Sequence, residues 1–245
     1  GRGESRQSGS GGGMSANDTP LRLTWQLASP IVVGAYPLHL DALVAFALAQ
    51  EMAQNNGGVQ DLTATLKLPL DQEIREGKTC VKASALLPTE SGEHSMRMWT
   101  RKSDPYDYAA RLEAGQFAVK TKFPLKPHGI KFDTQRGTFK QMFKFFAVRH
   151  VRTVQAWCVG DMDRLAELLA PEAGLITYLG AKTRMGYGRV LEFDIQHDEM
   201  ARENWAKRVL PWPVPNGVEI EAASSLPYWE VKNRGVAYVD PALFS

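Results

Sequence analysis

The stretch "DMDRLAELLAPEAGLITYLGAKTRMGYGRVLEFDI", residues 161–195, decides the fold. Its first part predicts a helix, because Asp161 can cap the N-terminus and Gly174 lies beyond the end. The apolar face of this helix consists of Leu165, Leu168 and Leu169. "LITYLG" and "RVLEFDI" are predicted strands, so the glycines and cations of "GAKTRMGYGRV" (180–190) form a loop between two strands.

Outward from this stretch, the chain alternates between strand and helix patterns. "LRLTWQLAS" (21–29) alternates apolar and polar residues, which is typical of a half-buried strand. "LHLDALVAFALAQEMAQNNGG" (38–58) has helical spacing and ends at an Asn-Asn-Gly stop signal. Further strands are predicted in "LTATLKLPL" (62–70), "CVKASALLP" (80–88), "MRMWTRK" (96–102) and "FFAVRHVRTVQAWCVG" (145–160).

This order of elements predicts an α+β fold with a ferredoxin-like (RRM-like) βαββαβ core. Residues 117–145 contain two prolines and two glycines and lack a strong period, which is typical of an inserted hairpin or long loop. We expect residues 1–13, "GRGESRQSGSGGG", to be the remnant of an expression tag. Residues 14–197 are expected to form the domain, and residues 198–245 an extended C-terminal segment that packs on the core.

Composition and charge narrow the class of protein. No apolar run reaches the ~18 residues of a membrane span, so no membrane partner is expected. Cys80 and Cys158 lack CxxC partners, which argues against a zinc site and favours reduced thiols and a cytoplasmic location. The net charge is only +2, but residues 120–152 hold nine Lys and Arg against one Asp, or 9 − 1 = +8. Such a basic segment predicts a polyanionic partner bound at one place.

The glycine-rich loop fits neither of two common phosphate- or RNA-binding motifs. A P-loop needs GxxxxGK[ST] before a helix, whereas Gly174 and Gly180 are one residue too far apart and a strand follows. An RNP1 strand needs a cation before its first glycine and two later aromatics, but Met185, Arg189 and Glu192 occupy those positions. The remaining pattern, G-x5-G-x-G, is either a loop that approaches an anion closely or a simple turn with solvated cations.

The segment "LGAKTRMGYGRV" (179–190) resembles the C-terminal glycine-rich loop of the CRISPR-associated RAMP superfamily. "LASPIVVGAYPLHLDALVAFALA" (27–49) is similar to the first strand, loop and helix of that superfamily, and the resemblance extends from Leu21 to Ile195. Within the superfamily, "PLHLDALVAF" and "LPYWEVKNRGVAYV" (226–239) resemble the small subunit of type IV Cascade-like complexes.

This resemblance implies a non-catalytic subunit that caps the 5′ handle of the guide RNA (crRNA), without a cofactor or metal. It implies a basic hairpin, the thumb, at the position of the basic segment. The implied partners are the guide RNA, backbone-forming RAMP subunits and a large or PAM-reading subunit, with target DNA as a further candidate.

The candidate RNA-binding residues come from the glycine loop and the basic segment. The loop supplies Gly180, Lys182, Arg184, Gly186, Tyr187, Gly188 and Arg189. The basic segment supplies Lys120, Lys122, Lys126, Lys131, Arg136, Lys140, Lys144 and Arg149.

Two alternatives remain open. Some RAMP proteins cut the guide precursor without metal, and His39 with Tyr187 or Lys182 supplies the acid and base that such an endoribonuclease needs. The competing interpretation of His39 is a ring that packs or hydrogen-bonds at the start of the first helix. The second alternative is an unrelated ferredoxin-like protein that binds RNA or another anion.

Overall fold

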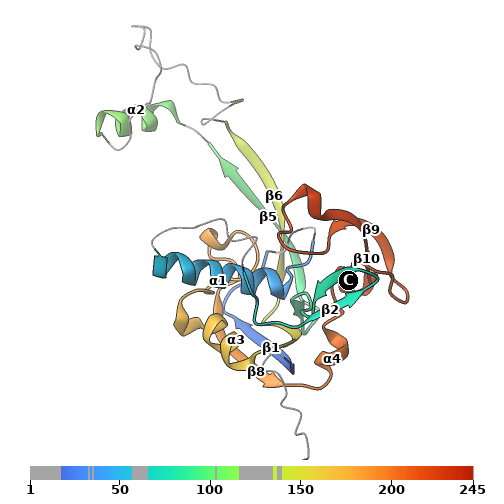
Figure 1. The fold of residues 1–245 in the computed structure, drawn as a ribbon. Coiled ribbons are helices and arrows are strands. Elements are labelled where there is room, and N and C mark those ends of the chain that lie inside the picture. The colour runs from blue at the N-terminus through green and yellow to red at the C-terminus, as the bar shows by residue number, and fades with distance from the viewer. Residues whose placement is uncertain are drawn as a thin grey trace, which may run out of the picture. The chain divides into compact units, whose positions relative to one another are not determined.

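The computed structural model describes residues 18–32, 34, 36–56, 66–102, 104–115, 135–136 and 140–244. It divides the chain into two compact units, which Figure 1 shows as ribbons. The main unit comprises residues 1–93 and 149–245, and the hairpin unit comprises residues 94–148.

The main unit is built on a four-stranded antiparallel sheet with the strand order β4-β7-β1-β8. The strands are β1 (Thr19–Leu27), β4 (Leu87–Pro88), β7 (Thr153–Gly160) and β8 (Val190–His197). β1 lies at the centre, where Leu23 pairs with Ala156 on one side and with Ile195 on the other. Leu21, Leu23 and Trp25 are fully buried, which confirms the alternation predicted for this strand.

Two helices connect the strands of this sheet. α1 (Leu40–Asn56) follows β1, and α3 (Met162–Leu169) lies between β7 and β8. The Asp161 carboxylate accepts a hydrogen bond from the Arg164 amide at 3.1 Å, so the predicted N-cap is correct. The helix ends at Leu169, earlier than predicted, because Pro171 cannot continue it and a short 3₁₀ turn follows.

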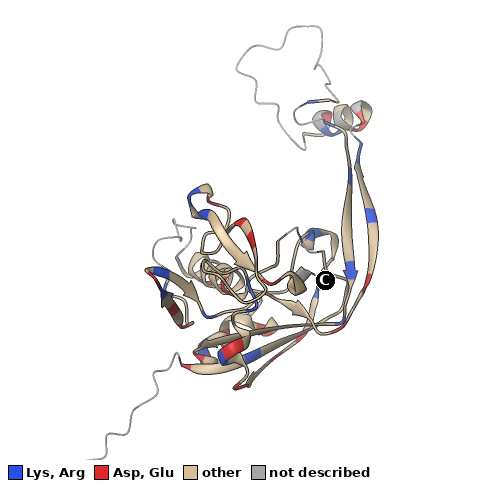
Figure 2. Ribbon diagram, turned by 90° about the vertical axis from the view of Figure 1, so that its right-hand side faces the viewer, with Lys and Arg blue, Asp and Glu red and all other residues tan. Residues whose placement is uncertain are grey.

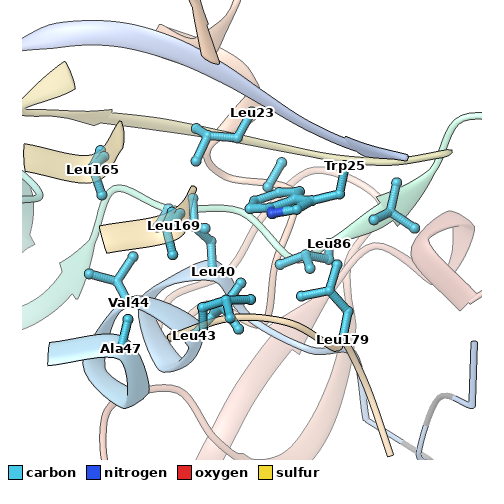
Figure 3. Close-up of a cluster of buried hydrophobic side chains, with 14 of the residues drawn as sticks. Leu23, Trp25, Leu40, Leu43, Val44, Ala47, Leu86, Leu165, Leu169 and Leu179 are labelled. Carbon is cyan, nitrogen blue, oxygen red and sulfur yellow. The ribbon is translucent and has the colours of Figure 1, made fainter. Parts of the chain in front are cut away.

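The hydrophobic core lies between the sheet and these helices. Figure 3 shows Val44 and Ala47 of α1 facing Leu165 and Leu169 of α3, with Leu23 of β1 above them. Helices are thus packed against an antiparallel sheet, and the α+β class is correct.

Four predicted strands differ from those in the structure. "LITYLG" (175–180) forms no strand, and within it Tyr178 makes only an isolated bridge to Arg189. The segment 145–160 divides between the end of β6 (Met142–His150) and β7. In the segment 62–70, residues 66–69 form no strand and Leu70 makes only a single bridge to Gly160, while the first residues lie outside the described part. Pro69 lacks the N–H that a strand ladder requires. The segment 80–88 divides between β3 (Lys78–Val81), which pairs with β2 (Gln72–Arg75), and β4, with isolated bridges between them.

The residues after β8 form the remainder of the main unit. They comprise α4 (Ala201–Asn204), β9 (Val218–Ala223) and β10 (Arg234–Val239), and the last two pair antiparallel. Short 3₁₀ turns cover Val231–Asn233 and Pro241–Phe244. Trp205, Leu210 and Trp212 pack with Cys80 and Val159 in a second buried cluster.

The hairpin unit contains two long strands and one helix. β5 (Glu93–Arg101) and β6 (Met142–His150) form a two-stranded sheet, and α2 (Pro105–Glu113) follows β5. β5 includes the strand predicted at 96–102 up to Arg101. Most of the predicted insertion at 117–145 lies outside the described residues, including Lys120, Lys122, Lys126 and Lys131. Within the described ranges, the helices are all too short or too polar to cross a membrane.

Candidate nucleic-acid interface

The glycine loop is held against the segment that follows β1. The Ala181 amide donates to Val32 O and the Gly188 amide to Pro30 O, both at 2.8 Å. The Ser29 hydroxyl accepts a hydrogen bond from the Arg189 amide at 2.9 Å and donates to Gly186 O at 2.7 Å. One serine thereby fixes both sides of the turn that contains Gly186.

The three glycines of the loop are required for different structural reasons. All have a positive φ, +82° at Gly180, +85° at Gly186 and +70° at Gly188. A Cβ at Gly180 would lie 2.6 Å from Val32 O, and a Cβ at Gly188 would lie 1.9 Å from Leu179 O. At Gly186 a Cβ would meet nothing within 4 Å. The close approach at Gly180 and Gly188 is therefore to the chain itself, whereas the Cβ position of Gly186 faces open space.

Most amide groups of the loop have acceptors within the protein. Besides the amides bound to Val32, Pro30 and Ser29, those of Met185 and Gly186 donate to the carbonyls of Lys182 and Thr183 around the short 3₁₀ turn Thr183–Met185. The first residues of such a turn have no acceptor within it. A main-chain anion contact is therefore expected at Thr183 and Arg184 rather than along the whole loop.

The side chains of the loop add positive charge to this surface. Lys182, Arg184 and Arg189 are all exposed. Within the part of the chain that the structure describes, neither Arg184 nor Arg189 forms an ion pair. Tyr187 lies half-buried next to Gly188. The arginine charges of the loop are thus available to an external anion.

The hairpin unit carries a second set of cations. Figure 2 shows Lys and Arg positions on both strands, and residues 94–101 and 142–148 contain no acid. Arg136, Lys140 and Lys144 are exposed. Phe143 and Phe145, on either side of Lys144, are also exposed and contact each other edge to face with centroids 5.0 Å apart.

Arg149 differs from the other cations predicted to bind RNA. It belongs to the main unit, where it is half-buried and its backbone pairs with Ile31 on both sides, at 2.8 and 3.0 Å. The backbone pairing with Ile31 therefore accounts for the position of Arg149 as well as a role of its charge in RNA binding would.

His39 lies in a buried polar cluster rather than on an open surface. The guanidinium of Arg208 lies 3.5 Å from His39 Nδ1 and donates to Asp41 Oδ2 at 3.1 Å. The Tyr228 hydroxyl donates to the same carboxylate at 2.7 Å, and its ring contacts the His39 ring edge to face. Arg208 also donates to the carbonyls of Val81 and Ala83 at 3.0 and 2.7 Å.

Burial and these contacts shift the pKa values of His39 and Tyr228. Burial, and then the positive charge of Arg208, lower the pKa of His39 from 6.5 to about 3, although Asp41 opposes this. Burial and the neighbouring Asp41 raise the pKa of Tyr228 well above its usual value of 10. His39 is therefore a neutral ring at physiological pH.

Sequence reasoning located His39 but missed its partners. Arg208 stands in "KRVLPWP" without any periodic or motif signal, and Tyr228 lies in the segment 226–239, whose resemblance to a type IV subunit does not indicate a contact with His39. The residues lie 169 and 189 positions from His39, so only the tertiary structure brings them together.

The fold and this loop define an α+β protein with a rigid, cationic glycine-rich loop at the edge of an antiparallel sheet. The chain belongs to the family of the CRISPR type IV associated protein Csf3, whose family model matches residues 19–240. This confirms the predicted association with type IV CRISPR systems; the assignment to the RAMP superfamily stays a prediction. No curated protein matches the chain.

Proposed function

We propose that this chain is a non-catalytic subunit that binds the 5′ handle of the guide RNA in a type IV CRISPR effector complex. Membership in the Csf3 family connects the chain to such a system. The observation that carries the proposal is the glycine loop, where Gly186 faces open space beside two arginines that form no ion pair within the described residues.

The loop offers a sugar-phosphate backbone two kinds of contact. Arginine side chains bind phosphate through several N–H donors at once. The start of the turn at Thr183 adds amide groups that have no acceptor within the turn. Because Ser29 already fixes the turn, little conformational entropy is lost when an anion binds.

The hairpin unit supplies features that suit unpaired RNA. Exposed Phe143 and Phe145 alternate with Lys144, and aromatic rings among cations are typical of surfaces that stack single-stranded bases. We propose that Arg136, Lys140 and Lys144, with Lys120, Lys122, Lys126 and Lys131 outside the described residues, form the thumb that contacts the guide.

The His39 cluster supports a non-catalytic assignment. A general base for RNA cleavage works best with a pKa near the working pH, whereas burial and Arg208 lower that of His39 to about 3. Its ring is 5% exposed and contacts Arg208 and Tyr228, so its Nδ1 is already engaged as an acceptor within the protein. We propose that backbone-forming RAMP subunits and a large or PAM-reading subunit complete the complex.

The test measures the affinity of the full chain for handle RNA as a function of salt. Arg184→Gln with Arg189→Gln should weaken binding and reduce the log–log salt slope by ~1.4, from ~0.7 for each single-strand phosphate contact. The matched control is Arg22→Gln with Arg202→Gln, because these exposed arginines form ion pairs with Asp198 and Glu199. An equal slope for both double variants would refute a role of the loop, and RNA cleavage in EDTA would favour the endoribonuclease.

A further inference from the structure

A small pocket lies in the main unit beside the start of α1. It has a volume of about 240 Å³ and a mostly apolar lining. The residues that line it come from 36–42, 209, 222–223, 228–229 and 234. A drug-sized ligand needs ~300–1,000 Å³, so this pocket holds a smaller group such as a single ring system.

One buried hydrogen-bond donor in this pocket lacks an acceptor. His39 lines the pocket, and among the described residues its Nε2 has no hydrogen-bond partner. Arg208 Nη2 approaches Nδ1 at 3.5 Å, and a guanidinium can only donate. Nδ1 is therefore the acceptor, and Nε2 of the neutral ring carries the proton. Buried donors without partners are rare and costly, so Nε2 would gain from an acceptor that a ligand in the pocket supplies.

Two exposed aromatic rings stand at the same pocket. Trp229 is 73% exposed and Tyr36 is 58% exposed, although both line a cavity whose other walls are apolar. Arg234, which is also exposed, adds a positive charge. The pocket thus combines exposed aromatic rings, a hydrogen-bond donor and a cation. This combination suits a ligand that consists of a flat ring with polar edges attached to an anion.

We infer that this pocket binds one unstacked nucleobase, with Trp229 against its face, His39 Nε2–H donating to its edge and Arg234 beside its phosphate. This inference rests on the proposed function, which makes the bound RNA the source of the base. A free nucleotide has the same chemistry and is distinguished by the experiment.

The experiment scans the handle RNA with a single abasic site at each position in turn. The full chain should lose roughly 5- to 100-fold in affinity at one position, which corresponds to the loss of one stacked base. Trp229→Ala should weaken the intact RNA by a similar factor and remove the penalty at that position alone. Val231→Ala is the matched control, because Val231 is 77% exposed two residues away and does not line the pocket. His39→Phe, which keeps a ring but removes the donor, should act in the same direction as Trp229→Ala.

The possible outcomes separate this inference from the proposed function. If RNA binding depends on Arg184 and Arg189 but no abasic position is sensitive to Trp229, the pocket does not bind a base and the inference is wrong. If the RNA does not bind at all, the proposed function fails, and titration with nucleoside monophosphates then decides about the pocket. If a free nucleotide binds and Trp229→Ala abolishes this binding, the pocket is a base-binding site whose ligand is a free nucleotide instead of RNA. If no nucleotide binds in this way, the inference is wrong as well.

Discussion

Alanine substitutions at the loop glycines should separate folding from RNA binding. Each costs ~1–2 kcal/mol for a Cβ in the left-handed region, since φ is +85° at Gly186 and +70° at Gly188. At Gly188 the Cβ would also lie 1.9 Å from Leu179 O. The backbone must then shift, which breaks the hydrogen bonds from Leu179 N to Gly188 O and from Gly188 N to Pro30 O, both 2.8 Å long.

The loss of these two hydrogen bonds sets how much more Gly188→Ala destabilises the protein than Gly186→Ala does. Each contributes ~0.5–1.5 kcal/mol net, so Gly188→Ala should lower the free energy of unfolding by about 2–5 kcal/mol and Gly186→Ala by about 1–2. Gly77 is a matched control, because it has a φ of +75° and open space around it but lies in the β2–β3 turn. Urea unfolding at constant m-value measures all three variants.

RNA affinity then tests the loop itself. Folded Gly186→Ala should bind handle RNA about 2- to 10-fold more weakly, because the added Cβ would hinder one contact of the bound backbone with the neighbouring Thr183 and Arg184 amides, while Gly77→Ala binds normally. Two results would contradict the reasoning. Equal destabilisation at Gly186 and Gly188 would refute the packing argument, and normal RNA binding by folded Gly186→Ala would make the loop a simple turn.

Three further predictions follow from the described contacts. The folded-state pKa of His39 is depressed to about 3, so its contribution to stability is present above pH 6.5 and is lost as the pH falls toward 3. Between pH 7 and pH 5 the free energy of unfolding of the wild type should therefore fall by about 2 kcal/mol more than that of His39→Gln. Urea denaturation at both pH values measures this difference, and an equal fall in both proteins would refute the prediction. Glutamine at Arg136, Lys140 and Lys144 should reduce the salt slope of RNA binding by ~2.1, whereas the same change at the ion-paired Arg75, Arg164 and Arg202 leaves it unchanged. Burial raises the pKa of Cys80 to about 11 and that of Cys158 further, so both thiols should react slowly with iodoacetamide in the native protein; rapid alkylation without unfolding would show that they are accessible.

The parts of the fold that the sequence predicted well depend on local patterns. The alternation in β1 and the Asp161 cap of α3 are set by residues within a few positions of one another, and both are correct. The predicted strand at 80–88 is interrupted in the structure. β3 ends at Val81 and Ala83 makes only an isolated bridge to Cys158, while the distant Arg208 donates to the carbonyls of Val81 and Ala83.

The candidate site shows the same division between local and distant determinants. The glycine and cation pattern located the loop from sequence alone. Glycine is required at positions 180 and 188 because a Cβ there would collide with Val32 and Leu179, respectively. A pattern of glycines in the sequence does not reveal which neighbour a Cβ would meet. Only Gly186 keeps the exposed role that the pattern suggested for all three.

The position of His39 connects the structure to the choice between binding and catalysis. A buried charge pair such as Arg208 and Asp41 must be satisfied on all sides, and here the tyrosine hydroxyl, two main-chain carbonyls and the imidazole share that task. The histidine is consequently fixed as a neutral acceptor toward Arg208, and only its opposite nitrogen remains for another group. A ring held in this way can donate one hydrogen bond to a ligand, but it cannot take up a proton at neutral pH without disturbing the pair beside it. The same cluster that connects the C-terminal segment to the start of α1 therefore supports the proposed non-catalytic role.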